Sequence, residues 1–205
     1  MENTEYLRAG VASGRPVGVD EEAKVINGYV VAQIGPFKTG RGEFDAEGLA
    51  AIVRLINAQP DGIVVNYGHH ENVGSPDAMD AFLGRAKNAR IDRDRVRADL
   101  HFNPVAFMSH TGGTSRGERL MQRAKTDPSS FASSLVLAAE KRPSARRGQP
   151  PTWHPMAIQS SDLVYVGDAV HGGILSADER AADDELRAHW ENLKRKVLTN
   201  DSHLP

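Results

Sequence analysis

Residues 83–102, LGRAKNARIDRDRVRADLHF, are the stretch that decides the fold. From Arg95 to Phe102 apolar and polar side chains alternate, which is typical of a half-buried strand with its apolar face at Val96, Ala98, Leu100 and Phe102. The polar turn Asp92-Arg93-Asp94 joins this strand to a second one over Leu83–Ile91. We therefore predict a β-hairpin, with antiparallel neighbours and one face open to solvent.

Four further segments have strand patterns, and most of them are rich in Val, Ile or small residues: Lys24–Gly35, Gly62–His69, Phe131–Ala138 and Ala157–Val166. A helix is expected after Asp45, since apolar side chains recur at i, i+3, i+4 and i+7, at Leu49, Ile52, Val53 and Ile56. A second, short helix is expected over Gly117–Lys125, ended by Asp127-Pro128. Six strands with hairpins in place of regular βαβ alternation predict an α+β fold: a mainly antiparallel sheet, closed or nearly closed into a small barrel, with a few helices around it.

The two ends of the chain are expected to lie outside this barrel. Residues 1–23 are polar and show no sustained period, so we predict a flexible leader. A Ser-x-x-Glu capping box at Ser176 to Glu179 begins a last helix, within residues 177–205, whose narrow apolar stripe suits docking on a surface or self-association: Leu186, Trp190, Leu193 and Val197. The stretch Arg142–Trp153 carries three Pro and is predicted to be an exposed loop, with its basic cluster at Arg142–Arg147 solvated.

Composition excludes several classes of function. With 25 Lys and Arg against 27 Asp and Glu, the net charge of −2 provides no basic field for nucleic acid. The chain has no Cys, so disulfides, thiolate chemistry and Cys-ligated zinc are ruled out. No apolar run approaches about 18 residues, and Met1–Glu5 is not the start of a signal peptide. We expect a soluble, cytoplasmic protein with no membrane partner.

Two segments carry side chains suited to nucleophilic catalysis. Val64-Val65-Asn66-Tyr67-Gly68-His69-His70-Glu71 ends a strand in two imidazoles, and Phe131-Ala132-Ser133-Ser134-Leu135-Val136-Leu137 brings two hydroxyls on another strand. A Ser hydroxyl is a weak nucleophile unless an imidazole within hydrogen-bond reach takes its proton. Adjacent strand residues face opposite sides, so only one of the two serines can point at the base. The Gly-x-Ser-x-Gly elbow is absent, which leaves an α/β-hydrolase without support.

Simpler interpretations stand beside this one. His69-His70-Glu71 is also what a polar turn looks like, and a Ser-rich strand also packs well against a helix. A metal site at these three residues is disfavoured, because adjacent strand side chains diverge and no His-Glu-x-x-His spacing is present. The other histidines considered are assigned to the surface or to loops: His101, His154 and His171.

Five motifs recur in an order and spacing that resemble a known family: Tyr67-Gly68-His69-His70-Glu71, Phe82-Leu83-Gly84-Arg85, Arg90-Ile91-Asp92-Arg93-Asp94-Arg95-Val96, Phe131-Ala132-Ser133-Ser134 and Ser161-Asp162-Leu163-Val164-Tyr165-Val166-Gly167-Asp168-Ala169. Over residues 24–176 the chain resembles the tailed-phage prohead (capsid maturation) proteases, serine proteases that share a fold with the herpesvirus assemblins. The resemblance implies that 24–176 is a protease domain.

The same resemblance implies roles for individual residues. It makes His69 the general base, with His70 as the alternative, and Ser133 the nucleophile, with Ser134 as the alternative. Asp162 orients the imidazole, with Asp168 as the alternative. Backbone N–H groups of Gly167, Asp168 and Ala169 are expected to hold the oxyanion, since Gly permits close backbone approach.

The implied activity is cleavage of phage scaffold and major capsid protein extensions inside the assembling prohead, in the host cytoplasm, together with self-cleavage. Neither cofactor nor metal is implied. The alternative from another functional class is a non-catalytic internal scaffolding protein of the same fold.

Overall fold

The computed structural model describes residues 4–8, 12–37, 42–68, 81–108, 113–144, 148 and 150–165. Within these residues the helices are α1 (Ala46–Asn57), η1 (Pro104–Phe107), α3 (Arg116–Thr126) and η2 (Pro128–Ser130). The strands are β1 (Thr4–Arg8), β2 (Ala12–Ser13), β3 (Gly18–Asp20), β4 (Val25–Gln33), β5 (Gly35–Pro36), β6 (Glu43–Phe44), β7 (Ile63–Tyr67), β8 (Phe82–Asp92), β9 (Arg95–Phe102), β10 (Phe131–Arg142) and β11 (Thr152–Tyr165).

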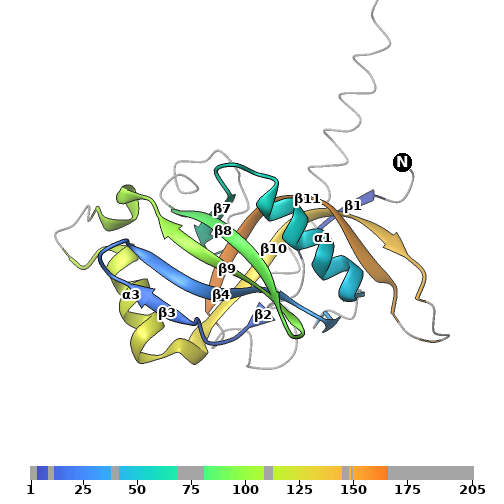
Figure 1. Cartoon of the computed structure of the whole chain (residues 1–205), viewed down its shortest axis with the longest axis horizontal. Coiled ribbons are helices and arrows are strands. Elements are labelled where there is room, and N and C mark those ends of the chain that lie inside the picture. The colour runs from blue at the N-terminus through green and yellow to red at the C-terminus, as the bar shows by residue number, and fades with distance from the viewer. Residues whose placement is uncertain are drawn as a thin grey trace, which may run out of the picture.

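All the strands belong to one sheet, whose main path runs β1-β10-β11-β7-β8-β9-β4-β3, with β2 beside β10 and β6 beside β11 (Figure 1). Within the described residues every pairing is antiparallel except those of β11 with β7 and with β6, so the sheet is mixed. All six predicted strands are present, as β4, β7, β8, β9, β10 and β11. The predicted α+β class is confirmed.

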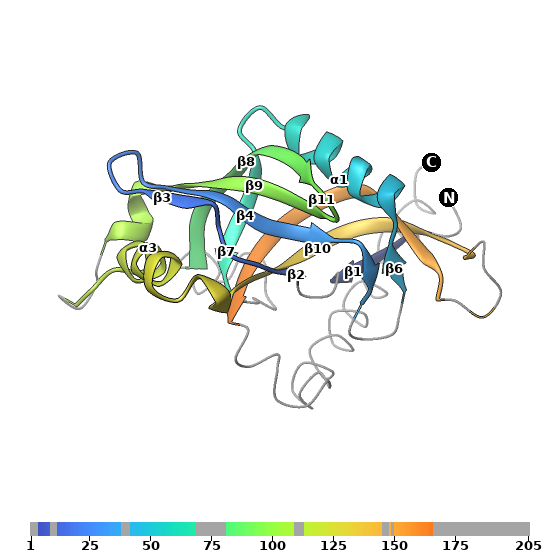
Figure 2. The ribbon, with the colours of Figure 1, turned by 60° about the horizontal axis from the view of Figure 1, so that its bottom comes forward.

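The sheet curls strongly, so that β4 passes across β10 although neither is the other's partner in the ladder (Figure 2). Ser133 on β10 donates its hydroxyl to the carbonyls of Val30 (2.8 Å) and Val31 (3.1 Å) on β4. The result is an open half-barrel, less closed than the sequence predicts.

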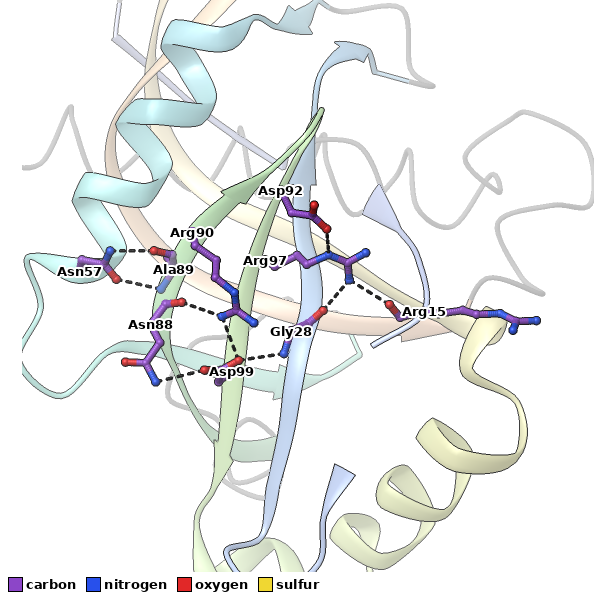
Figure 3. Close-up of polar contacts among 9 residues, drawn as sticks. All are labelled: Arg15, Gly28, Asn57, Asn88, Ala89, Arg90, Asp92, Arg97 and Asp99. Atoms are coloured by element: carbon purple, nitrogen blue, oxygen red, sulfur yellow. Dashed lines mark hydrogen bonds and ion pairs between the residues drawn. The ribbon is translucent and has the colours of Figure 1, made fainter. Parts of the chain in front are cut away.

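Helix α1 lies across β8 and β11 (Figure 1). It begins where the sequence predicts, because the Asp45 carboxylate accepts the Gly48 N–H at 2.8 Å. The apolar stripe is buried at Leu49, Ile52 and Ile56 and joins the core inside the curl. At the other end the Asn57 side chain bonds both the N–H (2.9 Å) and the carbonyl (2.8 Å) of Ala89 on β8, which ties the helix to the hairpin (Figure 3).

Helix α3 matches the predicted Gly117–Lys125 helix and starts one residue earlier. Its capping box has the Ser115 hydroxyl accepting the Glu118 N–H at 3.2 Å, while the Glu118 carboxylate accepts the Ser115 N–H at 2.8 Å. These hydrogen bonds, first from the Ser115 backbone and then from its side chain, hold the pKa of Glu118 below its usual value.

The predicted hairpin is β8 and β9, joined by a two-residue turn at Arg93-Asp94. Register shifts interrupt the ladder in β8 near Asn88 (φ 54°) and in β4 near Gly28 (φ 62°), on either side of β9. Asp99 on β9 connects the two, since its carboxylate accepts the Gly28 N–H at 2.8 Å and side-chain bonds from Asn88 and Arg90, each at 3.1 Å (Figure 3). The carboxylate thus holds both bulges in place.

These contacts also set the protonation of Asp99. Partial burial alone would raise the pKa of this carboxyl, but the hydrogen bonds from Gly28, Asn88 and Arg90 outweigh it and lower the pKa. Next to it, the Arg97 guanidinium bonds the Gly28 carbonyl at 2.6 Å and the Arg15 carbonyl at 2.9 Å, and so fastens the N-terminal segment to β4 (Figure 3).

Parts of residues 1–23, the segment expected to be a flexible leader, form strands. β1 pairs along β10, β2 pairs with β10 at Ala132 and Ser133, and β3 pairs with β4. The alternation in these strands is too short to be visible in the sequence, because β2 and β3 span only two and three residues.

The predicted loop over Arg142–Trp153 also needs correction at its ends. β10 extends to Arg142 and β11 begins at Thr152, and the side chain of Trp153 is buried in the core. His154 lies on β11, not in a loop, and its ring Nδ1 is 3.5 Å from Glu47. His101 on β9 is half-buried, with Nε2 shielded from solvent, so it is not a plain surface residue. His171, the capping box at Ser176 and the last helix lie outside the described residues.

Candidate functional site

Three polar side chains lie in one row across the middle of the sheet. β10 and β11 are antiparallel with Ser134 opposite Asp162, and β11 and β7 are parallel with Asp162 opposite Asn66. Residues in register on neighbouring strands point to the same face, with Cβ atoms about 5 Å apart for directly opposed antiparallel pairs. The row therefore brings a hydroxyl, a carboxylate and an amide together on one face.

Asp162 is held firmly in this row. Its Oδ1 accepts hydrogen bonds from the Asn66 amide at 3.2 Å and from the Ser160 hydroxyl at 2.9 Å. The residue is 3% exposed, and a buried carboxylate requires such partners. Sequence reasoning singled out Asp162 but missed Asn66 and Ser160; the available signal was that Ser160 is two residues from Asp162 and so shares its face in a strand.

The two adjacent serines have different surroundings. Ser133 is fully buried on the opposite face, where its hydroxyl bonds the Val30 and Val31 carbonyls across the curl. Ser134, 3% exposed, is the one that faces Asp162. The structure therefore does not bring Ser133 and Asp162 together as the sequence led us to expect; it pairs Asp162 with the alternative, Ser134.

The inner face of the same strands has its own polar pair. Ser161, next to Asp162 in the chain, accepts a hydrogen bond from the Tyr29 hydroxyl at 3.2 Å, and both residues are buried. Burial raises the pKa of Tyr29, and the nearby carboxylates of Asp162 and Asp99 add to this, against the lowering effect of the Ser161 bond. The phenol is therefore neutral and acts as a structural donor.

β7, the strand that precedes His69 and His70 in the sequence, ends beside this row. β7 carries Asn66, ends at Tyr67, and continues its pairing with β11 through the Gly68 N–H, which donates to the Leu163 carbonyl at 2.8 Å. Gly68 has φ 73°, a left-handed conformation that favours glycine, and β7 ends at the residue before it. The side chain of Tyr67 is 43% exposed, and the Arg116 guanidinium of α3 lies over its ring, 5.9 Å from the centroid.

Several predicted site residues lie outside the described residues. These are His69, His70 and Glu71, which follow Gly68 in the chain, and Gly167, Asp168 and Ala169, which follow β11. The choice between the two histidines, the role of Asp168 and the oxyanion loop all stay predictions. Within the described residues there is no group of three or more His, Asp or Glu side chains that could hold a metal ion. No helix in that part of the chain is both long and apolar enough to cross a bilayer.

Comparison of the chain with protein-family models, with curated proteins and with solved structures found no match. The row of Ser134, Asp162 and Asn66, with the end of β7 beside it, is therefore the feature of the described residues that bears on function.

Proposed function

We propose that this chain is a serine endopeptidase of the prohead maturation type, with Ser134 as its nucleophile. The observation that carries the proposal is the register: Ser134 is opposite Asp162, and Asp162 is opposite Asn66, on the strand that leads into His69 and His70. A hydroxyl and a carboxylate in register, next to a strand that two histidines follow in the sequence, are consistent with a Ser-His-Asp triad. The curled sheet supports the finer idea of an assemblin-like barrel.

In this proposal an imidazole of His69 or His70 removes the proton of the Ser134 hydroxyl while the oxygen attacks a peptide carbonyl. The same imidazole then protonates the leaving amine. Asp162 accepts a hydrogen bond from the ring N–H, which fixes the tautomer and stabilises the imidazolium. A carboxylate accepts about four hydrogen bonds, so an imidazole N–H can bind it together with Asn66 and Ser160.

The choice of Ser134 follows from the surroundings of the two hydroxyls. The Ser133 hydroxyl is hydrogen-bonded to two carbonyls of β4 inside the curl. If it moved to attack a substrate, it would give up this contact between β10 and β4. Ser134 lies on the opposite face of the strand, in register with Asp162. The expected substrates are scaffold and capsid-protein extensions inside the prohead. The protease is also expected to cut peptide bonds near its own termini.

A second function has an observation in its favour. Ser134 and Asp162 are each only 3% exposed, and Asp162 accepts hydrogen bonds from Asn66 and Ser160, as in a purely structural polar network. A non-catalytic scaffolding protein of the same fold would keep the row for its contribution to strand register.

A fluorophosphonate probe separates the two functions, because it reacts only with an activated serine hydroxyl. We expect one label per chain, located by peptide mass spectrometry on Ser134, and at least about 10⁴-fold slower labelling in Ser134→Ala. Ser133→Ala should keep the label as long as it is folded. Labelling should also be lost in one of the two variants His69→Ala and His70→Ala, and reduced less in the other.

Absence of labelling in the folded wild-type chain, together with termini that stay intact on storage, would favour the scaffolding function. A label on Ser133 would retain the enzyme but reverse the assignment of the two serines.

A further inference from the structure

The outer edge of β10, the strand that carries Ser134, is occupied by the N-terminal segment of the same chain. β1 pairs with it from Arg8 opposite Val136 to Thr4 opposite Glu140, and β2 pairs with Ala132 and Ser133. Ser134 thus lies between the two paired stretches. Figure 2 shows β1 lying along β10, with β2 nearer the β4 side.

The two N-terminal strands are held to different degrees. Ala12 in β2 is 3% exposed, and a Cβ added at Gly14 would lie 2.7 Å from a methyl group of Val30, so this part is embedded between β10 and β4. β1 is the terminal strand of the sheet path, and among the described strands it pairs with β10 alone. Its Glu5 side chain is exposed, while Leu7 is partly buried against the core. β1 is therefore the part that can leave without opening the curl.

We propose that the edge of β10 from Val136 to Glu140 is a binding site for an extended peptide, and that β1 is its built-in occupant. A strand edge offers unpaired N–H and carbonyl groups, which bind any extended backbone, and the side chains at alternate positions give selectivity. Leu7 is opposite Leu137, so a peptide that replaces β1 needs an apolar side chain at that position.

The site lies close to the proposed nucleophile. Val136 is two residues from Ser134, about 7 Å along an extended strand. Because β1 runs antiparallel to β10, from Glu140 toward Val136, a peptide that binds in its place continues toward Ser134 at its carboxyl end. The effect on catalysis rests on the proposed function: β1 then lowers the activity of the protease until it is displaced or removed. The peptide site itself does not depend on that function.

The experiment uses the full-length chain with Leu7→Asp, which removes the apolar anchor of β1, and Glu5→Gln, a matched change at an exposed position of the same strand. The probe is a fluorescein-labelled peptide with the sequence of residues 1–10, followed by fluorescence anisotropy. A second peptide carries Asp in place of Leu at its seventh position. Hydrogen exchange of residues 136–140 reports whether β1 is paired.

We expect exchange at 136–140 to rise at least about tenfold in Leu7→Asp, and the labelled peptide to bind this variant at least about tenfold more tightly than it binds wild type or Glu5→Gln. Bound peptide should restore the protection, and the Asp-containing peptide should not bind. If Leu7→Asp does not fold, Leu7→Ala takes its place with a smaller loss of packing. The proposal would be overturned if residues 136–140 lose their protection from hydrogen exchange in a Leu7 variant but that variant does not bind the peptide. It would also be overturned if no Leu7 variant changes this protection.

Two further measurements keep this test separate from the proposed function. Adding Ser134→Ala to the Leu7 variant should leave peptide binding unchanged, since the hydroxyl is not part of the strand edge. Fluorophosphonate labelling should be faster in the Leu7 variant than in wild type. Peptide binding without any labelling would preserve the strand site and count against the enzyme.

Discussion

Ser133→Ala should destabilise the protein without removing its chemistry. The Ser133 hydroxyl is fully buried and bonds the Val30 carbonyl at 2.8 Å and the Val31 carbonyl at 3.1 Å, the contact that joins β10 to β4 across the curl. Loss of one buried hydrogen bond costs about 1–3 kcal/mol, and the lower half applies here because a carbonyl has a second lone pair for its ladder partner. We expect a loss of about 1–2 kcal/mol in the free energy of unfolding, which lowers Tm by roughly 2–8 °C in a chain of this size.

The assay is thermal and urea unfolding followed by circular dichroism, with fluorophosphonate labelling measured on the same samples below the transition. Ser134→Ala is the matched control, as the same chemical change at the next residue on the opposite face. Ser133→Ala should unfold earlier and label normally, and Ser134→Ala should fail to label. A Ser133→Ala variant with unchanged Tm and no labelling would refute the assignment of the two faces and identify Ser133 as the nucleophile.

Three further predictions concern Gly28 on β4, Asp99 on β9 and Asp162 in the candidate site. Gly28→Ala should cost about 1–3 kcal/mol, because φ is 62° and the added Cβ would lie 2.5 Å from a Val17 methyl group, whereas Gly18→Ala has open space and should stay within about 0.5 kcal/mol by urea unfolding. The pKa of Asp99 is lowered on folding, so its stabilising effect is complete above its unfolded pKa and lost as pH falls through the folded value; the Tm difference from Asp99→Asn should be largest near neutrality and shrink below about pH 4. Asp162→Asn should slow labelling of Ser134 strongly but less than Ser134→Ala does, and equal rates in wild type and Asp162→Asn would exclude Asp162 as the orienting group.

Local sequence patterns predict the elements that are stabilised by residues close to one another in the chain. The Asp45 cap and the spacing of Leu49, Ile52 and Ile56 predict where α1 begins and which face it buries, since both signals act within one helix. The alternation in 95–102 gives β9 its correct bounds for the same reason. The capping box of Ser115 and Glu118 was present in the sequence as Ser-x-x-Glu and was overlooked.

Long-range pairing was not predictable in this way. β1 and β2 are strands because they pair with the edge of β10, which lies more than a hundred residues later in the chain. β1 has five residues and β2 has two, with little alternation, so their own sequences do not predict strands. The burial of Trp153 likewise depends on distant elements. For the serines, alternation predicts that one of them faces the site, but which one depends on β4 crossing β10, a tertiary contact with no local signal.

The middle of β10 and β11 carries five buried polar residues where β-branched side chains would pack better: Ser133, Ser134, Ser160, Ser161 and Asp162. Polar residues at such positions are expected where function or a specific contact requires them. Ser133 and Ser161 face inward, and their contacts with β4 explain them as structural. Ser160 and Asp162 face the other way with Ser134, and there the Asp162 carboxylate accepts hydrogen bonds from the Ser160 hydroxyl and the Asn66 amide. Because alternation places the two sets on opposite faces, substitutions of the inward set should lower Tm, and under the proposed function substitutions of the outward set should slow labelling of Ser134.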